Sequence, residues 1–146
     1  MAQETTVLNA LKTQLTNDAT LAAYVKNIFL GVRKAVPSFP FIVIEPQELL
    51  EADDVYGRQD LRFRVQVVGF IECLDPEKQI VGDATNKGII DLMLDVKKAI
   101  SADRTVGGSA IHAYIQSERF EYAEYPVRSV VLTVELFFRQ ASVART

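Results

Sequence analysis

The sequence predicts an α+β fold: a mostly antiparallel sheet of four to five strands, with N-terminal helices and one long helix packed on one face. Residues 60–72 and 127–140 alternate between apolar and polar side chains, which is typical of strands covered on one face. Residues 5–17 and 76–101 instead carry apolar side chains at helical spacing. The 146 residues are expected to form one domain, spanning residues 1–146.

Two helices are expected at the N-terminus. The first, over residues 5–17, has an apolar stripe made of Val7, Leu8, Leu11 and Leu15. Asp18 then suits the N-cap of a second helix, because its carboxylate can accept hydrogen bonds from free backbone N–H groups of the first turn. The stripe of this second helix is Leu21, Val25 and Ile28. Gly31 follows and marks the change to extended chain.

The stretch PSFPFIVIEPQ contains the first strand, which is expected at 40–45. Pro40 would take the first strand position and Pro46 the position just past the last, where a sheet tolerates a residue without an N–H group. Residues 41–44 are all apolar, so both faces of this strand should be covered, one by the helices and the other by the segment that follows or by a neighbouring subunit. Pro46 is expected to turn the chain into an acidic extended arm at about 46–60, either a long loop or a loose hairpin.

The strand at 60–72 shows the clearest alternation. One face carries Leu61, Phe63, Val65 and Val67, and the other carries Arg62, Arg64 and Gln66. The alternation shifts at Gly69, which predicts a bulge or bend after which Val68 and Phe70 take over the apolar role.

A long helix is expected over 76–101. Asp75 suits its N-cap and Pro76 its first helical position. Its apolar stripe is Ile80, Val81, Ala84, Gly88, Ile89, Leu92, Met93, Val96, Ala99 and Ile100. The sequence SADRTVGGSA then predicts a turn-rich connector.

Two strands close the chain, at 111–122 and 127–140, and the AEYP between them is short enough for a hairpin. The last strand places Val130, Leu132, Val134, Leu136 and Phe138 on one face. Val131 and Phe137 lie among the polar residues of its other face.

Composition excludes several classes of protein. The formal net charge of −3 and the isoelectric point near 5.2 argue against a dedicated nucleic-acid binder, which carries a concentrated basic face. No apolar run approaches the roughly 20 residues that span a bilayer. The N-terminus lacks the basic and then apolar order of a signal peptide, so we expect a soluble protein made in the cytosol.

The candidates for chemistry are few. Cys73 and His112 are the only cysteine and histidine, so a thiolate zinc cluster is excluded, whereas the two could in principle form a Cys–His pair. A cysteine at the end of an apolar strand is more typical of a buried structural thiol. The carboxylates of EADD, residues 51–54, lack the spacing and glycine of a calcium loop, and TVGGSA lacks the lysine of a phosphate-binding loop. We therefore expect no catalytic residue, no cofactor, no metal and no enzyme activity.

Two charged groups have simple structural interpretations. Asp91 and Asp95 lie one helical turn apart on a face expected to point outward, which is typical of a solvated helix surface. Arg58, Arg62 and Arg64 are compatible with a nucleic-acid stripe, but no aromatic residue shares their face for base stacking. Cross-strand pairing of these arginines with Glu135 or Glu118 is the favoured interpretation.

Apolar residues outside the expected core favour a subunit–subunit interface. They are Leu49, Leu50, Tyr56, Tyr122, Tyr125, Val131 and Phe137. Together with the acidic arm and the proline-bounded strand, they indicate an assembly part and not an isolated globule.

The order of these segments resembles a known family. The helical pair LNALKTQLTNDATLAAYVKNIFLG leads into PSFPFIVIEP, a charged arm, RFRVQVVGF, one long helix and RSVVLTVELFFR. Over nearly the whole chain this order resembles the tail terminator (tail completion, minor tail protein U-like) proteins of long-tailed bacteriophages.

The resemblance implies a virion structural protein, located in the tail or neck and assembled in the host cytoplasm. Such terminators form a homo-oligomeric ring, expected to be a hexamer, that caps the tail tube, stops its polymerisation and docks the head-side connector. The implied partners are the tail tube protein and the head-completion or connector protein, with DNA only passing through the lumen and no membrane contact. The expected subunit interface lies in the arm, at Glu48, Glu51, Asp53, Asp54 and Arg58.

Two alternatives remain from the sequence. One is another neck protein, a head-completion or connector adaptor. The other is a small-molecule-binding α+β domain, which would need a pocket lined by convergent polar groups.

Overall fold

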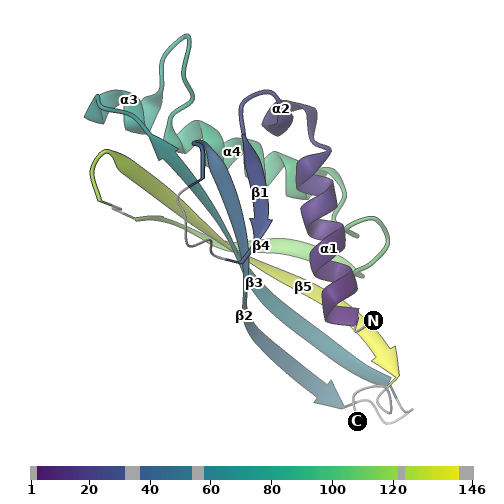
Figure 1. Cartoon of the computed structure of the whole chain (residues 1–146). Helices are drawn as coiled ribbons and strands as arrows, with labels where there is room; N and C mark the ends of the chain where they lie inside the picture. Colours follow the sequence, from purple (N-terminus) through teal and green to yellow (C-terminus); the bar gives the residue numbers. More distant parts are fainter. Residues whose placement is uncertain (1–2, 32–36, 54–57, 122–123, 142–146) are drawn as a thin grey trace.

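The computed structural model describes residues 3–31, 37–53, 58–121 and 124–141. The elements follow one another along the chain as drawn in Figure 1. They are α1 (Gln3–Thr16), α2 (Ala19–Ala22), β1 (Asn27–Leu30), β2 (Phe41–Asp53), β3 (Arg58–Glu72), α3 (Pro76–Val81), α4 (Ile89–Ala102), β4 (His112–Glu121) and β5 (Val127–Ala141).

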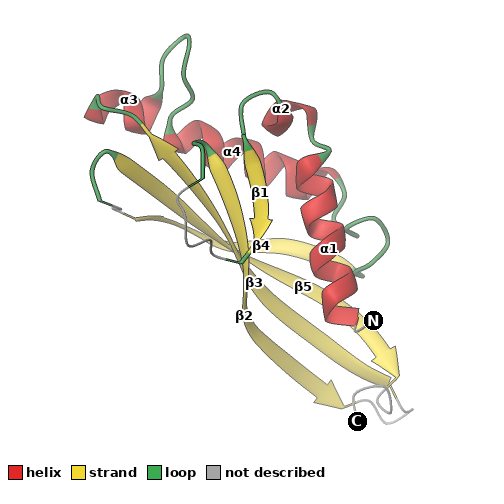
Figure 2. Ribbon diagram, in the orientation of Figure 1, coloured by secondary structure: helices red, strands yellow, loops and turns green. Residues whose placement is uncertain are grey.

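The strands form one sheet in the order β1-β2-β3-β5-β4 (Figure 2). The β1–β2 pair is parallel and the other three pairs are antiparallel, so the sheet is mixed. The predicted α+β class with a mostly antiparallel sheet is confirmed. We call the face that contacts α1 and α4 the helix face and the opposite one the outer face.

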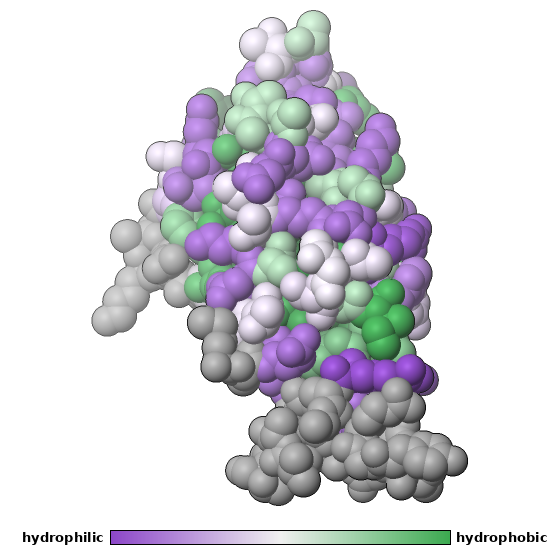
Figure 3. Space-filling view, turned by 90° about the vertical axis from the view of Figure 1, so that its right-hand side faces the viewer, coloured by the Kyte–Doolittle hydropathy of each residue, from purple (hydrophilic) through white to green (hydrophobic). Residues whose placement is uncertain are grey.

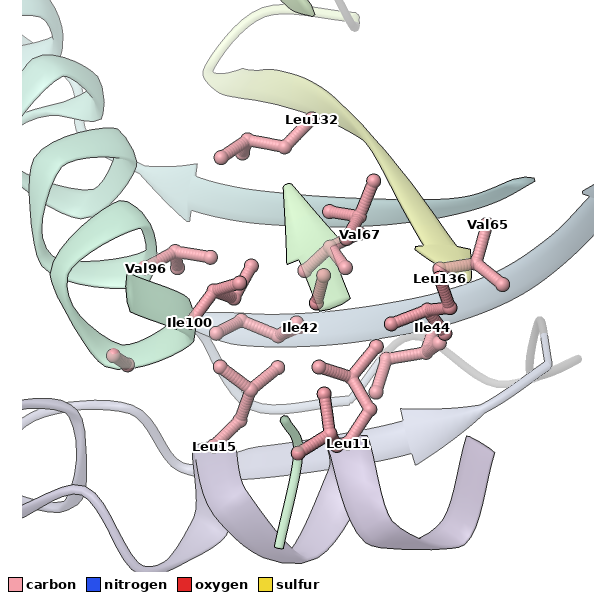
Figure 4. Close-up of a cluster of buried hydrophobic side chains, with 14 of the residues drawn as sticks. Leu11, Leu15, Ile42, Ile44, Val65, Val67, Val96, Ile100, Leu132 and Leu136 are labelled. Carbon is pink, nitrogen blue, oxygen red and sulfur yellow. The ribbon is translucent and has the colours of Figure 1, made fainter. Parts of the chain in front are cut away.

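The core lies between the helix face and the two long helices. Figure 4 shows Leu11 and Leu15 of α1 and Val96 and Ile100 of α4 converging on side chains from β2, β3 and β5. The face predicted for the last strand is confirmed, because every second residue from Val130 to Phe138 is buried. Gln14 fixes α1 against α4, since its Nε2 donates to the carbonyl oxygens of Ala99, Ile100 and Asp103 at 2.8, 3.2 and 3.0 Å.

The second N-terminal helix is shorter than predicted. Asp18 caps it as expected, accepting from the Leu21 N–H at 3.0 Å, but α2 ends at Ala22. Ile28, placed in the helical stripe by its spacing, lies in β1 and pairs with Ile42. The reason is tertiary: residues 27–30 gain a ladder of backbone hydrogen bonds from β2, which outweighs the local helical pattern.

Pro46 does not end the strand predicted at 40–45, which is β2 in the structure. β2 continues to Asp53, so residues 46–53 are strand and the long-loop interpretation of this part is wrong. Two features accommodate the proline: the register with β3 shifts between Pro46 and Glu48, and β1 pairs with β2 only as far as Ile44. At Pro46, β2 is therefore the edge of the described sheet, where a missing N–H group is tolerated.

Gly69 does not form a bulge. Its pairing with Ile42 and Val130 is regular, and the buried alternation of β3 continues through it to Ile71. Val68 and Phe70 therefore stay on the outer face, contrary to the prediction. The glycine instead allows close packing, because a Cβ at this position would lie 2.6 Å from Cδ2 of Leu92 on α4.

The predicted long helix is two helices, α3 and α4. Gly82 ends α3 with φ of +73°, a conformation that favours glycine. Gly88 is the N-cap of α4, and its N–H donates to Oδ2 of Asp91 at 3.1 Å. The interruption leaves Ile80 and Val81 exposed, although the helical spacing assigned both to the buried stripe.

Candidate subunit interfaces

The arm predicted at 46–60 is built from strand in its described parts, 46–53 and 58–60. Figure 1 shows these ends of β2 and β3 extending away from α3 and α4. The backbone of Asp53 pairs with that of Gln59, and the backbone of Arg58 pairs with that of Ala141 on β5. The arm is thus a continuation of the sheet.

The predicted interface residues do not share one face of the arm. Glu48 and Glu51 fall on opposite faces, since side chains alternate along a strand. The Glu48 carboxylate accepts from Nη1 of Arg64 at 3.0 Å on the outer face. Asp53 and Arg58 lie at the facing ends of β2 and β3, and Asp54 lies outside the described residues.

Among the arginines of β3, Arg64 lies beside carboxylates, as the cross-strand interpretation proposed for Glu135. Nε of Arg64 is 3.5 Å from Oε2 of the buried Glu135 on β5, so one guanidinium sits between two carboxylates. Glu118 does not take part, because it pairs with Lys97 of α4 instead. Arg62 lines a surface hollow of about 390 Å³ together with Leu50 and Phe137, which are its register partners on both sides.

Both faces of β2 are covered over residues 41–44, as the unbroken apolar run predicted. On the outer face Phe41 and Val43 are only 7% and 4% exposed. The Phe41 ring stacks on Phe70 with centroids 4.7 Å apart, and Phe39 and Phe29 lie at 5.1 and 6.4 Å. This cover comes from aromatic neighbours within the same chain, whereas the prediction assigned it to the charged arm or another subunit.

Asp95 is buried, which contradicts its predicted outward position. Its Oδ2 accepts from the Tyr24 hydroxyl at 2.6 Å and lies 3.5 Å from Nζ of Lys87, which is also 5.4 Å from the Tyr24 ring centroid. Burial, and then the hydrogen bond to this carboxylate, raise the pKa of Tyr24 well above its ordinary value. Asp91 caps α4, so the two aspartates have separate structural roles.

The geometry excludes a catalytic Cys–His pair. Cys73 follows Glu72, whose partner on β5 is Val127, whereas His112 pairs with Phe137. Ten residues of β5 separate these two positions, roughly 33 Å along the strand.

Metal sites, ligand-binding hollows and membrane-spanning helices have little support among the described residues. Within the described ranges, no three His, Cys, Asp or Glu side chains are grouped so that they could hold a metal ion. A hollow of about 380 Å³ is lined by Tyr24, Lys87 and Cys73 among others, but the polar ends of the first two are engaged with Asp95. No helix in the described part of the chain is long and apolar enough to cross a membrane.

Exposed apolar side chains lie on and next to α3, and of these the sequence interpretation named only Tyr125 as a surface residue. Leu74, Ile80, Val81 and Tyr125 are 74%, 37%, 66% and 53% exposed, and we call these four residues the apex. The face seen in Figure 3, the right-hand side of Figure 1, is by contrast a mixture of hydrophilic residues and small apolar areas. The sequence did contain one signal for this exposure: Gly82 directly follows Ile80 and Val81, and a helix that ends at this glycine cannot continue their apolar stripe.

The fold is found in solved structures, although no protein-family model matches the sequence and no curated protein matches it. One similar chain belongs to a structure described as the virion of native gene transfer agent (GTA) particle. The two chains superpose with a TM-score of 0.58 over 90% of this chain and 93% of that chain, at 14% sequence identity. At this identity the similarity shows a shared fold, and it extends over nearly the full length of both chains.

Proposed function

We propose that this chain is a virion structural protein and, more specifically, a tail terminator. In this role it forms a ring, expected to be hexameric, that caps the tail tube, stops tube polymerisation and docks the head-side connector. The observation that carries the proposal is the near full-length fold similarity to a chain of a virion particle. The order of segments in the sequence, which resembles that of tail terminators, supports the finer assignment.

The shape of the subunit supports assembly into a ring. A closed ring uses two different surfaces on each subunit, one for each neighbour. The chain offers candidate interaction surfaces at separate places, since the arm lies at one end of the long strands and the apex at the other. A net charge of −3 suits a ring through which DNA passes without being held.

The proposed partners follow from this role. They are further copies of the chain, the tail tube protein and the head-completion or connector protein. The mechanism needs no catalysis, cofactor or metal, because binding to the last tube ring is sufficient to block the addition of further subunits.

Electron microscopy of particles produced without this protein tests the proposal. Overlong or headless tails are the expected result, because nothing would stop the tube or join it to the head. Filled heads without tails would contradict the terminator role and support the alternative, a head-completion or connector adaptor. Normal particles would contradict both.

A further inference from the structure

The apex has an inverted polarity for a surface helix. α3 buries its glutamine, Gln79, and exposes Ile80 and Val81. Ordinary surface helices do the reverse, because burial of apolar side chains drives their packing. Four exposed apolar side chains in two neighbouring segments of the fold favour an interaction site.

A buried hydrogen-bond network holds the apex in place. Nε2 of Gln79 donates to the carbonyl oxygens of Cys73 and Pro126, and its Oε1 accepts from Nε of Arg128 at 3.0 Å. The Tyr125 hydroxyl donates to the carbonyl oxygen of Leu74 at 2.6 Å. The apolar surface is therefore pre-organised, which lowers the entropy lost on binding.

The segments that form the apex are rich in carboxylates. In residues 72–83 and 124–128, five acidic residues (Glu72, Asp75, Glu77, Asp83 and Glu124) stand against two basic ones, Lys78 and Arg128. Lys78 is already paired, with its Nζ 3.5 Å from Oδ2 of Asp83. The surface that binds the apex should thus be apolar at its centre and basic at its rim.

One groove on this chain has these properties. It lies between α1, α2 and β1 and has a volume of about 330 Å³. Its accessible apolar lining comes from the partly exposed Val25 and Ile28, which lie over the fully buried Leu15 and Leu21. Lys12 and Lys26 also line it, and none of its described lining residues carries a carboxylate.

We propose that the apex of one copy docks into this groove on the next copy. The apolar side chains of the apex would fill the groove while Lys12 and Lys26 face the carboxylates of the apex segments. Figure 1 shows α3 and α1 on opposite sides of the molecule, so the contact is head-to-tail and can propagate from copy to copy. This inference rests on the proposed function, because it supplies the contact that would close the proposed ring.

Disulfide trapping tests the contact directly. The chain carries Cys73→Ser, which removes its only cysteine, and then Leu74→Cys at the apex together with Thr16→Cys, which lines the groove. Mild oxidation of the double variant should give a ladder of covalent oligomers, and each single variant should stay monomeric. Covalent dimers from Leu74→Cys alone would overturn the inference, since they would place two apices together. A double variant without covalent oligomers at any concentration would also overturn it.

Charge reversal provides a second test that does not depend on cysteines. One chain carries Lys12→Glu and Lys26→Glu, and a second carries Glu77→Lys and Glu124→Lys. Each alone should lose self-association in light scattering, because like charges would face each other. Their mixture should recover it as alternating oligomers, and failure of the mixture to associate, with both variants folded by circular dichroism, would contradict the contact.

A third test compares one apolar-to-polar substitution at the apex with the same kind of substitution at an exposed position outside the proposed contact. Val81→Ser should weaken self-association roughly 30-fold if Val81 is a central contact residue. Leu94→Ser, at an exposed apolar position of α4 outside both surfaces, should leave it unchanged. Equal effects of the two substitutions would overturn the inference.

The two proposals can fail independently. Rings seen in light scattering without the covalent ladder would overturn the apex–groove contact and leave the terminator role standing. A covalent ladder together with tails of normal length in particles lacking the protein would do the reverse.

Discussion

The Tyr24–Asp95 hydrogen bond predicts a stability difference that depends on pH. Tyr24→Phe removes the hydroxyl that donates to the buried Asp95 carboxylate at 2.6 Å. A hydrogen bond to a charged group contributes about 1.5–3 kcal/mol, and Lys87 still faces the carboxylate in the variant. We therefore expect the free energy of unfolding at pH 7 to fall by about 1.5 kcal/mol, measured by urea denaturation.

The sign of the pH effect follows from the raised pKa of Tyr24. In the unfolded chain this phenol ionises near its ordinary pKa of 10.0, whereas in the folded chain it stays protonated to higher pH. The stabilisation is complete below pH 10 and is lost as the pH rises above it, because only the unfolded state gains from ionisation. At pH 11 this loss amounts to about 1.4 kcal/mol for the wild type, so the gap between the wild type and Tyr24→Phe should nearly close.

A matched control isolates this effect from the titration of the other tyrosines. Tyr114→Phe changes an exposed tyrosine on β4 and should shift neither the stability at pH 7 nor its alkaline dependence. Equal stability of Tyr24→Phe and the wild type at pH 7, or a gap that stays constant between pH 8 and pH 11, would refute the reasoning.

Three further predictions concern packing, backbone conformation and the arm. Leu132→Ala should lower the free energy of unfolding in urea by about 2–5 kcal/mol, because it leaves a cavity in the core; a loss below 1 kcal/mol would contradict full burial. Gly82→Ala should destabilise the fold by more than Gly107→Ala, since both residues have positive φ but only a Cβ at Gly82 would lie within 3 Å of other atoms; similar melting temperatures would count against this. Glu48→Ala should cost less than about 1 kcal/mol of stability because its salt bridge to Arg64 is at the surface, yet it should weaken oligomers in light scattering; unchanged association would remove Glu48 from the interface.

The sequence predicted best the elements whose signal is local. The alternation of β5 from Val130 to Phe138 repeats every second residue, and the buried face follows directly from it. Asp18 and Asp75 were assigned as helix caps from residue type and position, and both side chains accept the expected backbone hydrogen bonds.

The errors arose where a distant residue decides the outcome. Ile28 fits the spacing of a helical stripe, but it pairs with Ile42 of β2. Pro46 fits a strand end, but β2 is unpaired on its β1 side beyond Ile44 and can therefore accommodate a proline. Asp95 looks solvated unless Tyr24 is known to lie against it. Ile80 and Val81 were wrongly assigned to the core because no local signal shows that Gln79 is buried by its hydrogen bonds to the carbonyl groups of Cys73 and Pro126, which leaves its apolar neighbours exposed.

The uninterrupted pairing of β3 with β5 has a mechanical consequence. All fifteen residues from Arg58 to Glu72 are paired with β5 without a register shift, over roughly 46 Å. A ladder of this length is stiff along its axis, so the two paired strands rigidly connect the arm and the apex. A displacement imposed at one end of the subunit is therefore transmitted to the other end, and the length of the paired strands fixes the distance between the arm and the apex.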